Sequence, residues 1–323
     1  MKQNPHIIMK RSFVLILVLL ALVACDASSP ASSTAPVPDQ VPPRVAGISD
    51  GHSQPHIDPL QANADIQIVL VPSELIVGPN RFAVGLLKNN QALLDATVHF
   101  HYYDLGDLNR PVLESEADAV RLQTPDGLTA IWAQEREFTR SGDWGVEVQA
   151  RLAGDGAAIR RLGFHVTASS NTVKPGQKAP SVETLSVAAV GNDLRRLTSA
   201  VTPNAAFYRQ SLAQALNSGK PTALLFATPA FCQTRFCGPA YEIASALQKR
   251  YGETINFVHV EVFDGLPNPA TTAWHYAPAM QAYGLTTEPW LFLINRSGIV
   301  TYRVEGLFTE DEVNQHIRAL VAD

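Results

Sequence analysis

Two cysteines, Cys232 and Cys237, are the residues whose type and spacing most directly suggest chemistry in this chain. They lie between an apolar run, residues 223–226, and a segment, 239–251, whose apolar residues recur with the spacing of one helix face. The chain contains only one other cysteine, Cys25. Two thiols at a strand-to-helix junction predict a redox-active pair. A structural disulfide and a metal site are the alternatives.

The amino terminus has the pattern of a targeting segment. Lys10 and Arg11 precede an unbroken apolar run, residues 13–24, which is too short to span a bilayer as a helix. The run ends in Leu-Val-Ala-Cys25, which resembles the lipobox of bacterial lipoproteins. That resemblance implies a signal peptide over residues 1–24, an acylated Cys25, and an extracytoplasmic protein tethered to a bacterial membrane by lipid. An exported location permits disulfides. An ordinary secretory signal and an uncleaved anchor are the alternatives.

Composition divides the mature chain into four segments. Residues 25–64 are rich in Ser, Pro and Ala, which predicts a disordered membrane tether. Residues 65–168 and 183–323 show apolar periodicity and predict two folded domains, separated by a polar linker at 169–182. The net charge is −5 and there is no basic tract, so we do not expect a nucleic-acid partner.

The first predicted domain is all-β. Apolar residues alternate with polar ones in short runs such as Val98, Phe100 and Tyr102, and turn residues separate the runs. This pattern predicts an antiparallel sandwich of roughly seven strands. The segments Gly-Pro-Asn-Arg-Phe82 and Ser-Gly-Asp-Trp-Gly-Val-Glu-Val148 resemble the YtkA-like, immunoglobulin-like modules of bacterial extracytoplasmic proteins. That resemblance implies an immunoglobulin-like fold for residues 65–168.

His99 and His101 share one face of a predicted strand. Such a pair could bind a metal, but a polar outer face is the interpretation that the sequence favours. Copper-binding sandwiches often use methionine sulfur, and Met280 is the only methionine that remains after the signal peptide is removed. The sequence therefore gives little support to copper binding in this domain.

In the second predicted domain, helices and strands alternate. The expected helices cover residues 205–217, 239–251, 278–283 and 310–320, and the expected strands cover residues 222–227, 255–262, 290–294 and 299–304. The order β-α-β-α-β-β-α, with Cys232 and Cys237 at the first crossover and Glu288-Pro289 before the third strand, resembles the thioredoxin/TlpA/Sco superfamily. The fold class expected for the whole chain is thus a sandwich followed by an α/β thioredoxin-like domain.

The resemblance implies a site and an activity. Pro289 would be cis and lie beside the cysteines, and the backbone of Glu288 would contact the substrate. The activity would be thiol–disulfide exchange with exported proteins, through a mixed disulfide and without an organic cofactor. The chain departs from the family because four residues, not two, separate Cys232 from Cys237. Either cysteine could be the nucleophile. The helix amino terminus and Arg235 are expected to favour a thiolate at Cys237.

Two other functions remain open at this point. A Sco-like copper chaperone would bind Cu(I) through Cys232, Cys237 and a histidine, for which His259 and His275 are the candidates. A non-catalytic thioredoxin-fold module would hold an inert disulfide. Exchange is favoured because a disulfide that closes so small a ring contributes little stability.

Overall fold

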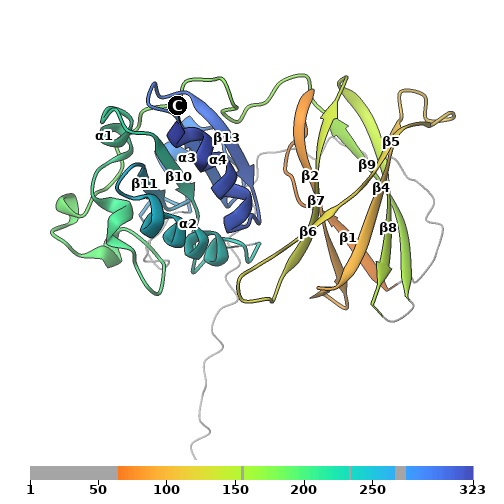
Figure 1. Ribbon diagram of the computed structural model, residues 1–323, viewed down its shortest axis with the longest axis horizontal. Coiled ribbons are helices and arrows are strands. Elements are labelled where there is room, and N and C mark those ends of the chain that lie inside the picture. Colours follow the sequence, from red (N-terminus) through yellow and green to blue (C-terminus); the bar gives the residue numbers. More distant parts are fainter. Residues whose placement is uncertain (1–64, 154–155, 233, 266–273, 323) are drawn as a thin grey trace, which may run out of the picture. The chain divides into compact units, whose positions relative to one another are not determined.

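The computed structural model describes residues 65–153, 156–232, 234–265 and 274–322 of the 323-residue chain (Figure 1). The predicted signal peptide, the acylated Cys25 and the tether lie outside the described residues and stay predictions. The described residues from 65 onward belong to one compact unit. In this part of the chain, no helix combines the length and apolar character needed to cross a bilayer.

Between residues 65 and 168 the described residues form nine strands. They are β1 (Ile66–Leu70), β2 (Gly78–Lys88), β3 (Gln91–Ala92), β4 (Ala96–Asp104), β5 (Val112–Asp118), β6 (Val120–Gln123), β7 (Ala130–Phe138), β8 (Gly142–Leu152) and β9 (Ala157–Val166). One sheet has the order β1-β2-β7-β6, with β3 paired to β2, and the other has the order β5-β4-β8-β9. All these pairings are antiparallel.

The two sheets share one apolar core. Along β4, Val98, Phe100 and Tyr102 are buried, whereas the alternate residues face away from the core. Phe82 of the first sheet meets Phe100 of the second edge to face, with ring centroids 5.3 Å apart. The Trp132 indole nitrogen donates a hydrogen bond to a backbone carbonyl of β4 at 2.9 Å. The predicted sandwich is therefore present as two packed antiparallel sheets.

The prediction of roughly seven strands was too low. Strands β5 and β6 lie at the edges of the two sheets, and most of their residues are exposed. An edge strand that buries few side chains needs no apolar alternation, so the sequence carries no pattern that would reveal it.

Residues 169–182, predicted to be a linker, are partly attached to the C-terminal region. The Gly176 amide donates to the Val300 carbonyl at 2.8 Å, and the Ala179 amide donates to the Gly298 carbonyl at 2.9 Å. Ala179 is also buried. These contacts use the backbone, which explains why the polar composition of the segment did not predict them.

The C-terminal region contains four strands and several helices. They are the 3₁₀ helices η1 (Ala188–Val190), η2 (Leu194–Arg196) and η3 (Ala205–Tyr208), the helices α1 (Leu212–Leu216), α2 (Cys237–Tyr251), α3 (Pro278–Ala282) and α4 (Glu310–Ala322), and the strands β10 (Thr222–Phe226), β11 (Asn256–Val260), β12 (Trp290–Ile294) and β13 (Val300–Glu305). The sheet order is β11-β10-β12-β13. Strands β10 and β11 are parallel, and the other two pairings are antiparallel.

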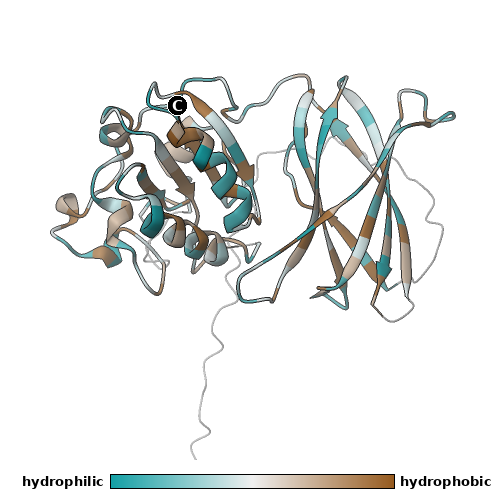
Figure 2. Ribbon diagram, viewed as in Figure 1, coloured by the Kyte–Doolittle hydropathy of each residue, from teal (hydrophilic) through white to brown (hydrophobic). Residues whose placement is uncertain are grey.

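This sheet is covered on both faces. Every residue of β10 and β12 is buried, and Figure 2 shows the apolar colouring of β10. One core cluster joins the sheet to α2 and α4, and a second joins it to α1 and α3. Burial on both faces explains the continuous apolar runs in the two strands.

The order of these elements is as predicted, but some boundaries differ. The helix expected over residues 205–217 is divided into η3 and α1, because Ser211 is extended and opens a new helix with a capping box to Gln214. Helix α2 begins at Cys237, two residues before Pro239. Strand β11 is shorter than the predicted 255–262.

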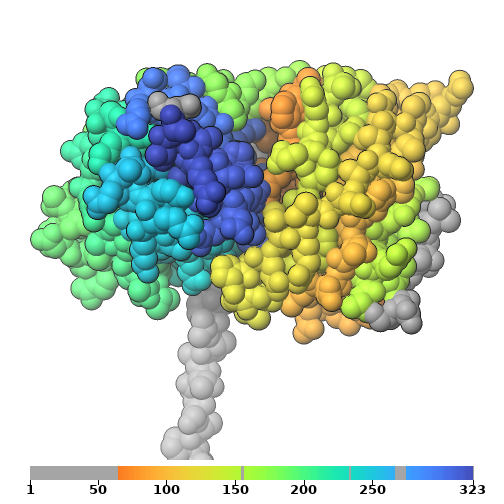
Figure 3. All heavy atoms as spheres, in the orientation of Figure 1, coloured from red at the N-terminus to blue at the C-terminus, as the bar shows by residue number. Residues whose placement is uncertain are grey.

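The acidic turn predicted before the last helix is present. The Glu312 amide donates to the Thr309 hydroxyl at 3.2 Å, and the Thr309 amide donates to the Glu312 carboxylate at 3.4 Å. These reciprocal bonds satisfy two amides at the start of α4. Helix α4 appears dark blue on the face of the molecule shown in Figure 3.

Candidate redox site

The two cysteines lie where the chain passes from β10 to α2. Cys232 is in the connecting loop and Cys237 is the first residue of the helix. They form a disulfide with a Cα–Cα distance of 5.8 Å, within the usual range for such bonds. The structure therefore brings together the pair that the sequence singled out.

The two sulfur-bearing residues differ in exposure. Cys237 is 0% exposed and belongs to the core cluster that includes α2, whereas Cys232 is only partly buried at the edge of that cluster. An external disulfide can thus reach Cys232 but not Cys237. This difference favours the assignment in which Cys232 attacks and Cys237 resolves.

Hydrogen bonds around Cys232 point to the same assignment. The backbone amide of Cys237 donates to the Cys232 Sγ at 3.2 Å, and the Thr234 hydroxyl lies 3.4 Å from that sulfur. Amides at a helix amino terminus stabilise negative charge. The sequence predicted that the helix would favour a thiolate at Cys237. Instead, the first helical amide points to the sulfur of Cys232.

The segment before β12 lies against the cysteine loop. The Glu288–Pro289 bond is cis, as the sequence resemblance implied, and the Thr234 hydroxyl donates to the Glu288 carbonyl at 3.3 Å. Glu288 is buried, and one of its carboxylate oxygens lies within 4.8 Å of both cysteine sulfurs. The site thus combines two sulfurs, a helix amide, a hydroxyl and a buried carboxylate.

His259 is fully engaged in the core of the C-terminal region. Its Nδ1 accepts from the Tyr208 hydroxyl at 2.7 Å, and its Nε2 donates to the Ala227 carbonyl at 3.0 Å. Burial lowers the pKa of His259 to about 3, although the hydrogen bond to Ala227 opposes the shift. The imidazole is therefore neutral, and both of its nitrogens already have partners.

The histidine candidates for a copper site are thus not grouped with the sulfurs. Within the described part of the chain, the Glu288 carboxylate lies close to the sulfurs of Cys232 and Cys237. Neither His259 nor His275 belongs to this group. His275 is exposed, and the neighbouring Trp274 packs edge to face against an aromatic ring of the cysteine loop. A hard carboxylate is not the ligand that Cu(I) prefers.

Sequence reasoning missed a second buried acid that supports the cysteine loop. Glu261 accepts a hydrogen bond from the Thr228 hydroxyl and another from the Ser199 amide, each at 2.5 Å. Burial is the main cause that raises the pKa of Glu261, and these hydrogen bonds lower it in part. The Ser199 hydroxyl in turn accepts from the Ala230 amide at 3.2 Å. A single acidic residue at the end of an apolar strand gives no sequence signal for this role.

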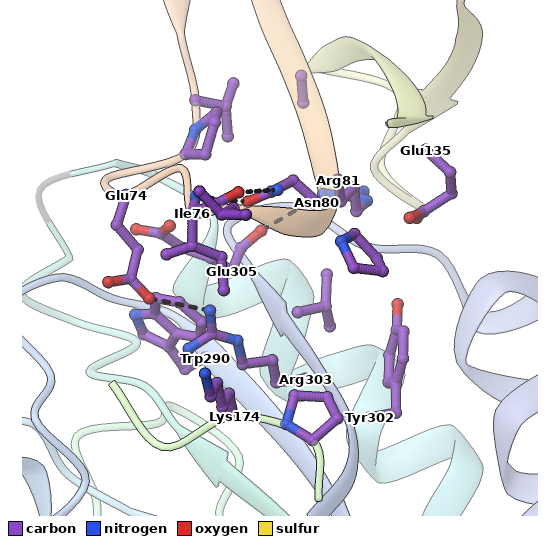
Figure 4. A pocket seen from close by; sticks show the side chains of 17 residues that line it. Glu74, Ile76, Asn80, Arg81, Glu135, Lys174, Trp290, Tyr302, Arg303 and Glu305 are labelled. Atoms are coloured by element: carbon purple, nitrogen blue, oxygen red, sulfur yellow. Dashed lines mark hydrogen bonds and ion pairs between the residues drawn. The ribbon is translucent and has the colours of Figure 1, made fainter. Parts of the chain in front are cut away.

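A cavity of about 490 Å³ is lined in part by Trp290, the residue that follows Pro289 (Figure 4). Its lining includes Trp290 and Glu305, and neither cysteine contributes to it. Glu305 accepts hydrogen bonds from the Ser73 amide at 2.8 Å and the Thr287 hydroxyl at 2.6 Å. Burial raises the pKa of Glu305. The bond to Thr287 holds the segment that contains the cis proline, just before β12, against the end of β13.

No family model and no curated protein sequence matches the chain. Among solved structures, a Chlorobium tepidum protein described as thiol:disulfide interchange protein DsbE is similar at 19% identity and a TM-score of 0.31, covering 46% of this chain and 99% of its own. A thioredoxin-family thiol:disulfide interchange protein from Chlorobium tepidum TLS is similar at 21% identity and a TM-score of 0.31, covering 46% and 98%. A superoxide reductase from Ignicoccus hospitalis gives 13% identity and a TM-score of 0.20, covering 31% and 79%. Scores this low carry no argument about function, which rests on the geometry of the cysteine site.

Proposed function

We propose that this protein carries out thiol–disulfide exchange through Cys232 and Cys237, with Cys232 as the nucleophile. The observation that carries the proposal is the asymmetry of the pair. Cys232 is partly exposed and its sulfur accepts a hydrogen bond from a helix-terminal amide, whereas Cys237 is fully buried. A thiolate stabilised at a partly exposed position is what an exchange nucleophile requires.

In the reducing direction, the Cys232 thiolate attacks one sulfur of a partner disulfide. A mixed disulfide forms, and the partner's other sulfur leaves as a thiolate that takes a proton from water. The Cys237 thiol then loses its proton, for which the Glu288 carboxylate is the base at hand. The Cys237 thiolate attacks the Cys232 sulfur, which releases the partner as a dithiol and closes the Cys232–Cys237 disulfide. The reverse steps oxidise a partner dithiol.

The partners that we propose are exported proteins with exchangeable thiols or disulfides. The proposed setting is the extracytoplasmic face of a bacterial membrane, with Cys25 acylated and residues 25–64 as the tether. The C-terminal region would be a thioredoxin-like domain, since its element order and its cysteine and cis-proline positions fit that fold. The two-sheet region would be an immunoglobulin-like module.

Trapping of mixed disulfides tests the exchange. We expect the Cys237→Ser variant to accumulate disulfide-linked adducts with partner proteins on non-reducing gels, because the resolving thiol is gone. The Cys232→Ser variant should accumulate none, since Cys237 is buried. The double variant is the matched control. Equal trapping by both single variants would contradict the assignment of the nucleophile.

The reduction potential of the pair separates exchange from an inert bridge. An exchanging pair should have a potential above about −250 mV, whereas a structural disulfide should lie below about −300 mV. A pair that can be reduced only after the protein has unfolded would overturn the proposed function.

Acylation of Cys25 is tested by mass spectrometry of the protein from its native membrane. We expect acyl mass on Cys25, and we expect Cys25→Ala to abolish acylation and leave the precursor uncleaved. Mature protein with an unmodified Cys25 would contradict the anchor and leave the exchange proposal intact.

A further inference from the structure

The outer face of β4 carries two adjacent imidazoles. His99 and His101 are two positions apart, so both point away from the core that holds Phe100. Their ring centroids are 4.9 Å apart. The His99 side chain is 34% exposed and that of His101 is 18% exposed. Two imidazoles at this separation can share one ligand on the surface of the sheet.

The strands on both sides of β4 supply carboxylates to the same face. The register pairs His99 with Asp118 and His101 with Glu116 on β5, and it pairs His101 with Glu147 on β8. The Nε2 atom of His101 lies 3.2 Å from the Glu116 carboxylate. Two imidazoles and one carboxylate therefore converge, with ligand atoms of His99, His101 and Glu116 within 4.8 Å of one another.

The remaining carboxylates face the other nitrogen of each ring. His99 Nδ1 lies 2.7 Å from Asp118, which leaves its Nε2 available. His101 Nδ1 is buried and has no hydrogen-bond partner among the described residues, and the Glu147 carboxylate is 3.7 Å away. Glu147 itself is 7% exposed and accepts from Arg161 Nε at 2.7 Å. Carboxylates behind metal-binding histidines commonly orient the ring in this way.

We propose that His99, His101 and Glu116 bind one divalent transition-metal ion of the Zn²⁺ type. Asp118 and Glu147 act as positioning residues. Ligand atoms about 2.0–2.1 Å from a tetrahedral Zn²⁺ lie roughly 3.3 Å from each other, which matches the 3.2 Å between His101 and Glu116. Three protein ligands leave one position open to water or to a small ligand.

A single metal ion would account for the two adjacent imidazoles and the carboxylate that meet on this face of the sheet. A metal at the Nε2 atoms would bind neutral rings, with Nδ1–H of His99 donating to Asp118 at 2.7 Å and Nδ1–H of His101 directed toward Glu147 at 3.7 Å. Nitrogen and oxygen ligands suit Zn²⁺ and similar ions, whereas Cu(I) prefers sulfur.

Calorimetric titration of ZnCl₂ into the full chain, with the Cys232–Cys237 disulfide oxidised, tests the site. The disulfide keeps the sulfurs from binding, and any histidine outside the described residues contributes equally to every variant. We expect the His101→Ala variant to bind one Zn²⁺ ion fewer per chain than the unaltered protein. The matched control is His165→Ala, which removes a histidine of the same sheet that pairs with Asp143 at 2.8 Å. The control should bind as many Zn²⁺ ions per chain as the unaltered protein.

Glu147→Gln separates the proposed positioning role from ligation. All three ligands remain in this variant, so it should still bind the same number of Zn²⁺ ions. The affinity of the site for Zn²⁺ should fall about 10- to 100-fold. Circular dichroism checks that each variant is folded, and His99→Gln replaces His101→Ala if the latter is not. Unchanged stoichiometry in both histidine variants, or equal loss in His165→Ala, would overturn the proposal.

Discussion

The two sheets that carry candidate chemistry differ in how they are covered. Strands β10 and β12 are buried along their whole length, whereas β4 alternates buried with partly exposed residues. Along β10 and β12, reactive groups can meet solvent only beyond a strand end, and Cys232 lies beyond the end of β10. In the half-open sheet, the register of three strands gathers His99, His101 and Glu116 on the outer face.

Histidine shows what this difference does to one residue type. His259 on β11 faces a layer of helices and becomes a neutral, doubly hydrogen-bonded core residue. His101 on β4 is partly exposed and lies among carboxylates, and the described residues place no second layer over it. A histidine within a strand is therefore structural or available for binding according to whether a second layer covers it.

The largest effect that we expect is on stability, from Phe292→Ala in β12. Phe292 is 0% exposed and packs against aromatic rings in the core, so its loss should lower the free energy of unfolding by about 3–5 kcal/mol. His99→Ala on the open face, measured with a chelator present, should change it by only about 0.5 kcal/mol. Urea unfolding followed by tryptophan fluorescence measures both. Similar losses would mean that the outer face of β4 is not open.

An intermediate effect should come from the pH dependence of His259. Burial lowers its pKa from the ordinary value of 6.5 to about 3 in the folded chain. The unfolded chain therefore binds a proton that the folded chain cannot, and stability is lost as the pH falls from 6.5 toward 3. Between pH 7 and pH 5, this difference in proton binding should lower the free energy of unfolding by about 2 kcal/mol.

The matched comparison for this prediction is His259→Gln. The variant should lose about 2 kcal/mol less between pH 7 and pH 5 than the unaltered protein does. The buried acids Glu261 and Glu305 titrate in both proteins, so their contributions cancel in the difference. His275→Gln, at an exposed position, should behave like the unaltered protein. An identical pH dependence for His259→Gln would show that the imidazole can be protonated inside the fold.

The smallest effect that we expect concerns the loop between Cys232 and Cys237. Thr234→Val removes a hydroxyl that lies 3.4 Å from the Cys232 sulfur and 3.3 Å from the Glu288 carbonyl, and that can turn its single proton to the Cys232 thiolate when the pair is reduced. A hydrogen bond of this kind contributes about 1 kcal/mol, so alkylation of reduced Cys232 by iodoacetamide at neutral pH should slow roughly fivefold. Thr234→Ser keeps the hydroxyl and should react at the original rate. Equal alkylation rates for the Val and Ser variants would mean that the Thr234 hydroxyl does not affect the reactivity of Cys232.

Much of this organisation could be predicted from sequence because it rests on local patterns. The apolar runs and helical spacing around Cys232 and Cys237 predicted the junction, and the motif at Pro289 predicted the cis bond. Patterns of this kind could not show that the amide of Cys237 points to the other sulfur, or that Glu261 supports the loop. Those contacts depend on where segments far apart in the chain meet.

The same limit applied to the sandwich. Alternation revealed the strands that bury a face, but β5 exposes most of its side chains and gave no signal. That strand nevertheless supplies Glu116 and Asp118 to the histidines of β4. Without the register, His99 and His101 could be read only as a polar surface.

The attachment of residues 173–179 has a consequence for how the chain moves. The composition of this segment predicts a flexible linker. Its backbone amides at Val173, Gly176 and Ala179 nevertheless donate hydrogen bonds to carbonyls of the C-terminal region. Amides held in this way exchange slowly with deuterium, as those of an edge strand do. In a hydrogen-exchange experiment, we therefore expect the protected part of the C-terminal region to begin at residue 173, and we expect proteases to cut slowly over these residues.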